Sequence, residues 1–169
     1  MHKTTALVLS FLVVFFPFAG PAASPPPELP PCIHDSSDFR CFQQNLHPLY
    51  EKNIDLFWRS WRYQEDKAKS CSSIPFTSQF ISLVVQSDGE LAEVMGEFIE
   101  NLVLTNVGCF LGAAERLDDG TMKHLIRFYL MTPLYHEQSE ILPIIERALK
   151  KGQFPKFDDT YFNISKTAR

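Results

Sequence analysis

The sequence lacks the short motifs that mark many catalytic sites. It contains no G-x-S-x-G, no H-E-x-x-H and no glycine-rich loop of the kind that cradles phosphates. His34 precedes Asp35 and His136 precedes Glu137, but neighbours along a chain rarely form a catalytic dyad. We therefore interpret the histidines His34, His47, His124 and His136 as capping or surface residues. No catalytic residue, metal site or cofactor is predicted, and a small hydrolase using two distant carboxylates is kept as the weaker alternative.

The chain also lacks a basic stripe with interleaved aromatic residues, which argues against nucleic-acid binding. Its net charge is −4, from 16 basic and 20 acidic residues. The charge is uneven, because residues 88–119 hold eight acids and a single base, Arg116. A partner that recognises this segment is expected to present a basic protein surface.

No apolar run downstream of the N-terminus reads as a membrane span. The run Ala6–Phe16 follows His2 and Lys3, precedes a stretch of small residues, and is too short to cross a bilayer comfortably. This order predicts a signal peptide over residues 1–22 and an extracytoplasmic location, periplasmic or secreted. An uncleaved anchor is the alternative, and Leu29-Pro30-Pro31 before Cys32 does not resemble a lipobox.

The cysteines lack the C-x-x-C spacing of zinc sites, which makes a metal site the weaker interpretation. Four cysteines behind a signal peptide predict two disulfides. Cys71 precedes one predicted helix and Cys109 follows the next, so an antiparallel hairpin of these helices brings the two cysteines together. We predict Cys71–Cys109 and Cys32–Cys41. The alternative Cys41–Cys71 pairing requires the two ends of a long helix to approach each other.

The rest of the pattern predicts an all-α domain. Residues 23–36 form a proline-rich extended arm, residues 37–152 a helical domain, and residues 153–169 an aromatic tail without a clear period. Apolar spacing and turn residues place helices over residues 38–46, 48–69, 75–86, 90–105, 109–117, 122–130 and 139–151. We expect a compact irregular bundle of about six short helices, or HEAT-like stacked helical hairpins, stapled by disulfides. No fixed repeat period is present.

The segment 90–105 is the predicted centre of the domain, with one apolar and one acidic face. The apolar positions recur with helical spacing: Leu91, Val94, Met95, Phe98, Ile99, Leu102 and Val103. The acidic positions are the candidate contact face: Glu90, Glu93, Glu97 and Glu100. The simpler interpretation of these glutamates is a solvated helix face. Gly96, which is unfavourable inside a helix, predicts a closely approaching neighbour.

Aromatic residues of the segment 48–69 allow two interpretations. Trp58 and Trp61, together with Tyr50 and Tyr63, have the spacing of core residues on a helix, and the alternative is an aromatic face for a sugar or a peptide. In the tail, Phe154, Phe157, Tyr161 and Phe162 are expected to cover an edge of the core.

The eight residues between Cys32 and Cys41, the helical pattern and the signal peptide resemble plant inhibitors of pectin methylesterase and invertase. The stretch from Cys41 to Cys71 is shorter than the first long helices of that family need, so the resemblance covers spacings alone and no residue role is carried over. The sequence thus favours a non-catalytic binding or structural role, with an inhibitor of a secreted enzyme as the alternative.

Overall fold

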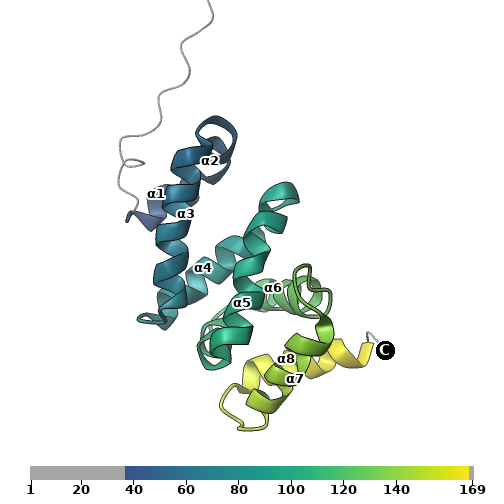
Figure 1. Cartoon of the computed structure of the whole chain (residues 1–169). Helices are drawn as coiled ribbons and strands as arrows, with labels where there is room; N and C mark the ends of the chain where they lie inside the picture. The colour runs from purple at the N-terminus through teal and green to yellow at the C-terminus, as the bar shows by residue number, and fades with distance from the viewer. Residues whose placement is uncertain (1–36, 168–169) are drawn as a thin grey trace, which may run out of the picture. The chain divides into compact units, whose positions relative to one another are not determined.

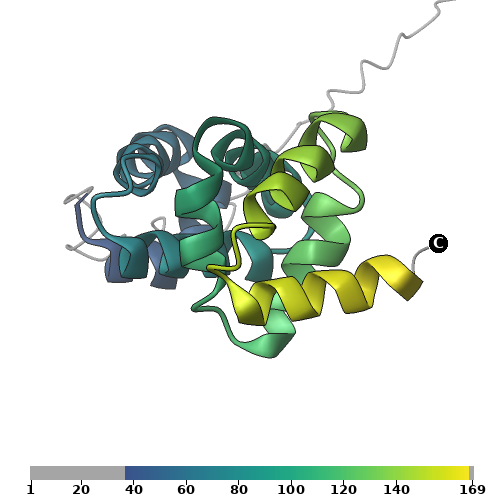
Figure 2. The same ribbon diagram turned by 90° about the horizontal axis from the view of Figure 1, so that it is seen from below.

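A computed structural model describes residues 37–167 of the chain, and these residues form a helical bundle without strands. The elements are α1 (Phe39–Gln44), α2 (Leu46–Lys52), α3 (Ile54–Lys69), α4 (Ile74–Gln86), α5 (Gly89–Ala114), α6 (Asp119–Leu125), a π-helical segment (Ile126–Leu130), α7 (Gln138–Leu149) and α8 (Pro155–Thr167). Helices α1–α3 lie at one end of this bundle and α7 and α8 at the other (Figures 1 and 2). The predicted signal peptide 1–22 and arm 23–36 lie outside the described residues.

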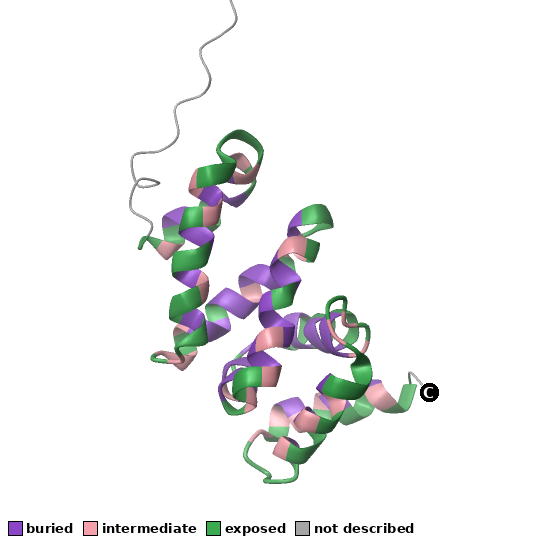
Figure 3. Cartoon of the chain, in the orientation of Figure 1, coloured by how far each residue is buried: buried purple, intermediate pink, exposed green. Residues whose placement is uncertain are grey.

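The hairpin of α4 and α5 forms the centre of the bundle. α4 packs along α5, α3 packs against α4, and α7 covers another side of α5. Buried positions are concentrated on α4 and α5 (Figure 3). α5 is long and apolar enough to cross a membrane by length and composition. In this structure α5 packs against α4 and α7, so its apolar residues form part of the core of the bundle.

The described residues contain eight α-helices, not the predicted number of about six. Asparagines divide the first part of the chain, because Asn45 and Asn53 adopt non-helical backbone angles between α1, α2 and α3. The Asn53 side chain then accepts a hydrogen bond from Leu56 N at 3.2 Å and caps α3. HEAT-like stacking of these helices stays a prediction.

The predicted break between residues 105 and 109 is a kink within α5, at Asn106. Asn106 has φ −152° and ψ 67°, outside the helical region, while its neighbours stay helical. Its side-chain oxygen accepts a hydrogen bond from Cys109 N at 3.2 Å, which caps the second part of the helix as an N-cap residue does. α5 therefore consists of two helical parts that meet at a kink at Asn106, within the predicted break.

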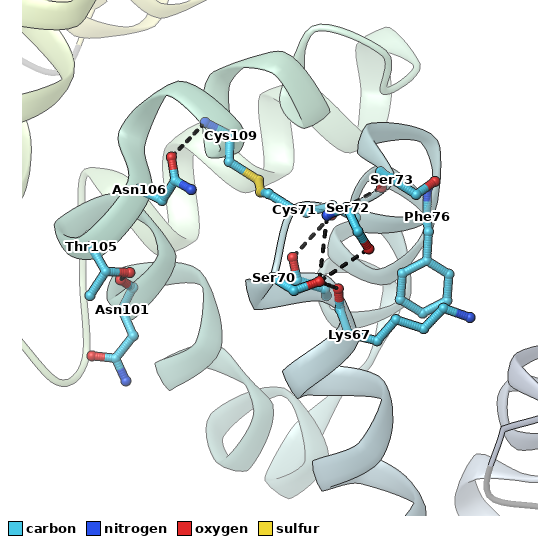
Figure 4. Close-up of a disulfide and its surroundings, with 12 residues drawn as sticks. Lys67, Ser70, Cys71, Ser72, Ser73, Phe76, Asn101, Thr105, Asn106 and Cys109 are labelled. Atoms are coloured by element: carbon cyan, nitrogen blue, oxygen red, sulfur yellow. Dashed lines mark hydrogen bonds between the residues drawn. A yellow bond between two sulfur atoms is a disulfide. The ribbon is translucent and has the colours of Figure 1, made fainter.

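The predicted Cys71–Cys109 disulfide is confirmed, with 6.1 Å between the two Cα atoms (Figure 4). Cys71 follows the last residues of α3 in the left-handed backbone region, at φ 54°, where glycine is the usual residue. Cys41 is also disulfide-bonded. Its predicted partner, Cys32, lies outside the described residues.

The aromatic tail, for which the sequence analysis assigned no periodic structure, forms helix α8. Pro155 begins the helix, and Phe157, Tyr161 and Ile164 are buried along one side. Glu115, just after α5, accepts hydrogen bonds from Lys156 N at 3.0 Å and Phe157 N at 2.9 Å. The start of α8 is thus capped by a carboxylate from a distant part of the chain.

Candidate binding site between α3 and α5

A groove runs between α3 and α5, the two helices that flank α4. Its volume is about 390 Å³. The lining residues are Trp58, Trp61, Arg62 and Glu65 from α3 and Val94, Glu97 and Phe98 from α5. Figure 1 shows α4 running from the end of α3 towards α5, which sets these two helices apart from each other.

Aromatic rings form the base of the groove. The Trp61 ring lies 4.8 Å from the Phe80 ring, and the Phe80 ring lies 4.9 Å from the Phe98 ring, centroid to centroid. Trp61 and Phe98 are 4% and 1% exposed, so both are chiefly core residues. Trp58 remains half-buried. The two tryptophans therefore have different roles. Trp61 packs in the core beneath the groove, whereas Trp58 exposes part of its ring to the groove.

The groove has charged residues on both walls. On α3, Arg62 Nε donates to Trp58 O at 3.2 Å, and Glu65 forms an ion pair with Lys69 at 2.6 Å. On α5, the exposed Glu97 accepts a hydrogen bond from the Asn101 side chain at 3.3 Å. Glu97 forms no ion pair with any residue of the described range 37–167. Its negative charge is thus available to a ligand.

The predicted acidic face is only partly exposed. Glu90, Glu93 and Glu97 are exposed and form what we call the acidic ridge of α5, whereas Glu100 is 1% exposed. A helix turns about 100° per residue, so Glu100 lies only about 20° round the axis from the exposed Glu93, two turns further along α5. At that turn residues 134–136, in the connection before α7, cover the helix. Glu100 is therefore removed from the candidate contact face.

Glu100 instead anchors the connection between the π-helical segment and α7. Its carboxylate accepts hydrogen bonds from Leu134 N at 2.7 Å, Tyr135 N at 3.0 Å and His136 N at 2.8 Å. The His136 Nδ1 atom lies 3.1 Å from the same carboxylate. These donors replace the water that a buried carboxylate loses, which explains how a glutamate is accommodated in this position.

Tyr135 lies beside the acidic ridge, and its side chain is 46% exposed. Its hydroxyl donates a hydrogen bond to the Glu93 carbonyl oxygen. Burial of part of the side chain raises the pKa of Tyr135, and the charges of Glu97 and Glu93 raise that pKa further. The ridge consequently has an aromatic residue on each side: Trp58 across the groove and Tyr135 on the connection before α7.

Gly96 has the close neighbour that the sequence predicted. A Cβ atom at this position would lie 3.1 Å from Tyr129 Cε1. The Tyr129 hydroxyl in turn donates to Val84 O at 3.2 Å. The glycine therefore lets the Tyr129 ring pack directly on the α5 backbone.

The histidines of the described residues lie at separate places. His47 Nε2 is 3.8 Å from Asp88 Oδ1, the His124 ring lies 4.4 Å from the Phe128 ring, and His136 contacts Glu100. Residues 37–167 contain no group of three histidine, cysteine, aspartate or glutamate side chains placed to hold a metal ion. The α3–α5 groove and its acidic ridge are a candidate surface for a ligand.

Comparison with protein-family models, curated proteins and solved structures finds no match for this chain. Any functional interpretation therefore depends on the groove itself. The sequence pointed to Trp58, Trp61 and Glu97 separately, but it did not show that α3 and α5 bring them together. Val94 was predicted on the apolar face of the 90–105 helix, Arg62 carried no signal of its own, and the role of Tyr135 depends on the fold of the connection before α7.

Proposed function

We propose that this protein is an extracytoplasmic, non-catalytic binding protein that holds a basic segment of a partner protein in the α3–α5 groove. The observation that carries the proposal is the position of Glu97, which lines the groove and also belongs to the acidic ridge. A segment lying in the groove would meet apolar rings at the base, the negative charge of Glu97 on the α5 edge and Arg62 on the α3 edge.

The chemistry of the partner follows from these two features. A lysine or arginine side chain can lay its aliphatic stem on Trp58 and direct its charge towards Glu93 and Glu97. An adjacent leucine or aromatic side chain can fill the space between Val94 and Phe98. We expect an arginine on the partner to bind better than a lysine, because a planar guanidinium both stacks on rings and pairs with carboxylates.

The proposed location has independent support from the covalent structure. A disulfide such as Cys71–Cys109 is compatible with an oxidising compartment, such as the periplasm or the extracellular space. The proposed signal peptide over residues 1–22 would deliver the chain to that compartment.

Selection from a displayed random-peptide library, followed by affinity measurement, tests the proposal. We expect enriched peptides to combine arginine or lysine with leucine or an aromatic residue. The double variant Glu93→Lys and Glu97→Lys should lower their affinity by at least about tenfold. A matched control is the double variant Glu51→Lys and Asp159→Lys, which makes the same charge change at exposed positions on α2 and α8.

The two variants separate a local site from general attraction. Equal loss in both would mean that only net charge matters, and unchanged binding by the Glu93 and Glu97 variant would place the interface elsewhere. If the natural partner proved to be a secreted enzyme that loses activity on binding, the inhibitor alternative would be favoured over a purely structural role.

A further inference from the structure

Asn163, on α8, begins the sequence Asn163-Ile164-Ser165, which is the acceptor pattern for N-linked glycosylation. The middle residue of the pattern must not be proline, and here it is isoleucine. The other asparagines of the chain have no serine or threonine two residues further on: Asn45, Asn53, Asn101 and Asn106. The sequence therefore offers a single asparagine to the glycosylation machinery of a secretory pathway.

The surroundings of Asn163 also set it apart from the other four asparagines. Each of those four side chains takes part in a hydrogen bond with a neighbouring turn, at 2.8 to 3.3 Å. Within residues 37–167 the side chain of Asn163 forms no hydrogen bond, and only its carbonyl oxygen accepts one, from the Thr167 hydroxyl. Asparagine is also one of the weaker helix formers. Neither a hydrogen bond nor helix propensity thus accounts for an asparagine at this place on α8.

Asn163 lies on the solvent-facing side of α8. Its neighbours one helical turn away on that side, Asp159, Lys166 and Thr167, are all exposed. The buried residues of α8 lie on another side of the helix. α8 itself lies at the end of the described bundle opposite α1–α3 (Figures 1 and 2). A glycan on the Asn163 side chain would therefore extend into water without displacing a residue of the core.

The acceptor pattern also lies close to the end of α8, which is at Thr167. Helix ends fray, so the last turns can open and present Asn163 and Ser165 in a non-helical conformation. The Ser165 hydroxyl donates a hydrogen bond to Phe162 O at 3.1 Å, within the same helix. This bond is lost together with the last turns, and the hydroxyl that the pattern requires becomes accessible.

We propose that Asn163 carries an N-linked glycan, added as the chain is exported through the endoplasmic reticulum. The side-chain amide nitrogen bonds to the anomeric carbon of an oligosaccharide that is carried on a lipid pyrophosphate. The bond from that carbon to the phosphate oxygen breaks, the lipid pyrophosphate leaves, and the amide proton passes to a base of the transferase. Such a glycan requires the extracytoplasmic location given under the proposed function, but it does not require the α3–α5 groove.

Expression of the full chain, with its own residues 1–22, in cultured eukaryotic cells tests the site. We expect the exported protein to migrate as a larger species on gel electrophoresis, and to return to the mobility of the unmodified chain after treatment with peptide N-glycosidase F. This glycosidase leaves aspartic acid at the position that carried the glycan. Mass spectrometry of the treated peptides should find that change at position 163 and at none of the other four asparagines.

Two substitutions should each abolish the mobility shift. Asn163→Gln removes the acceptor, and Ser165→Ala removes the hydroxyl that the pattern requires. Ser165→Thr keeps a hydroxyl at that position and should keep the glycan. Asn101→Gln, at an asparagine outside the pattern, is the matched control and should also keep it.

The possible failures are distinguishable. An exported chain whose mobility is the same before and after the glycosidase would overturn the glycan and leave the location standing. A chain that stays inside the cells with residues 1–22 attached would overturn the location and the glycan together. A shift that persists in both the Asn163→Gln and the Ser165→Ala protein would overturn the assignment to Asn163.

Discussion

At the scale of single residues, Glu100 shows how a charged side chain can serve the interior of a helical bundle. Its carboxylate, 1% exposed, accepts three backbone N–H hydrogen bonds from residues 134–136. Glu100→Gln removes the negative charge and turns an N–H₂ group towards donors. We expect the free energy of unfolding to fall by roughly 2–3 kcal/mol, since hydrogen bonds to charged groups are the stronger kind.

Urea denaturation measures this change, and Glu97→Gln is its control. Glu97 is exposed on the same helix, where substitutions usually alter stability by less than about 0.5 kcal/mol. Equal effects of the two substitutions would mean that the Glu100 carboxylate contributes nothing beyond an ordinary surface residue.

Two glycines of α5 give opposite expectations for the same substitution. Gly96→Ala places a Cβ atom 3.1 Å from Tyr129 Cε1, and the Tyr129 ring is held by its hydrogen bond to Val84 O. Overpacking outweighs the better helix propensity of alanine there, and we expect a net loss of about 1 kcal/mol. Gly108→Ala meets no atom within 4 Å and should stabilise by about 0.5 kcal/mol. Thermal unfolding of both variants decides the matter, and a stabilised Gly96→Ala protein would contradict the expectation.

At the scale of elements, Cys71 has two roles. It forms the disulfide with Cys109, and it follows α3 with a left-handed backbone conformation. Removing Cys71–Cys109, which closes a loop with a sequence separation of 38, should cost about 3–4 kcal/mol by chain entropy. In the double variant Cys71→Ala, Cys109→Ala, alanine also has to adopt the left-handed angles of Cys71, φ 54°. Cys71→Gly, Cys109→Ala avoids that cost, and we expect it to be more stable than the alanine pair by about 1 kcal/mol.

Chemical denaturation gives the free energy of unfolding of both double variants. Because neither variant has the disulfide, the difference between them reports the backbone conformation at position 71. If the glycine form were the less stable of the two, the left-handed angle at position 71 would not persist once the disulfide is gone.

The sequence predicted those elements that depend on residues close together along the chain, such as apolar spacing and turn residues. The hairpin of α4 and α5 follows from apolar spacing and the turn at residues 87–89, and its antiparallel arrangement led to the Cys71–Cys109 pair. The break between the first two helices was predicted at residue 47 and lies at Asn45. The break at Asn53 was missed, because asparagine disfavours a helix only weakly. The signal for α8 was present, since Phe157, Tyr161 and Ile164 have helical spacing after Pro155.

Features that depend on distant contacts could not be predicted in this way. The burial of Glu100 depends on where residues 134–136 pass, and the groove depends on how far α3 stands from α5. Neither distance is encoded in the periodicity of one segment. Glu100 therefore resembled its neighbours Glu93 and Glu97 in the sequence, although its position in the structure is different.

At the scale of the whole molecule, the acidic charge of residues 88–119 has two uses. Glu100, Glu115 and Asp118 accept backbone hydrogen bonds and stabilise the fold, while Glu90, Glu93 and Glu97 are exposed. The exposed glutamates can attract a basic partner through water. Because exposed charges are screened by salt, we expect affinity for a basic peptide to fall steadily as NaCl rises from about 0.05 to about 0.5 M. Titrations at several salt concentrations measure the slope, and an affinity independent of salt would exclude the ridge as the source of attraction.

The Cys71–Cys109 disulfide also makes residues 71–109 a covalent ring. One wall of the groove, with Val94, Glu97 and Phe98, belongs to this ring, while the wall carrying Trp58 and Arg62 lies outside it. A protease cut at Gly89, between α4 and α5, leaves both fragments joined until a reductant is added. The separation of the two walls is set by the packing of α3 on α4 and by the disulfide that ties the end of α3 to α5.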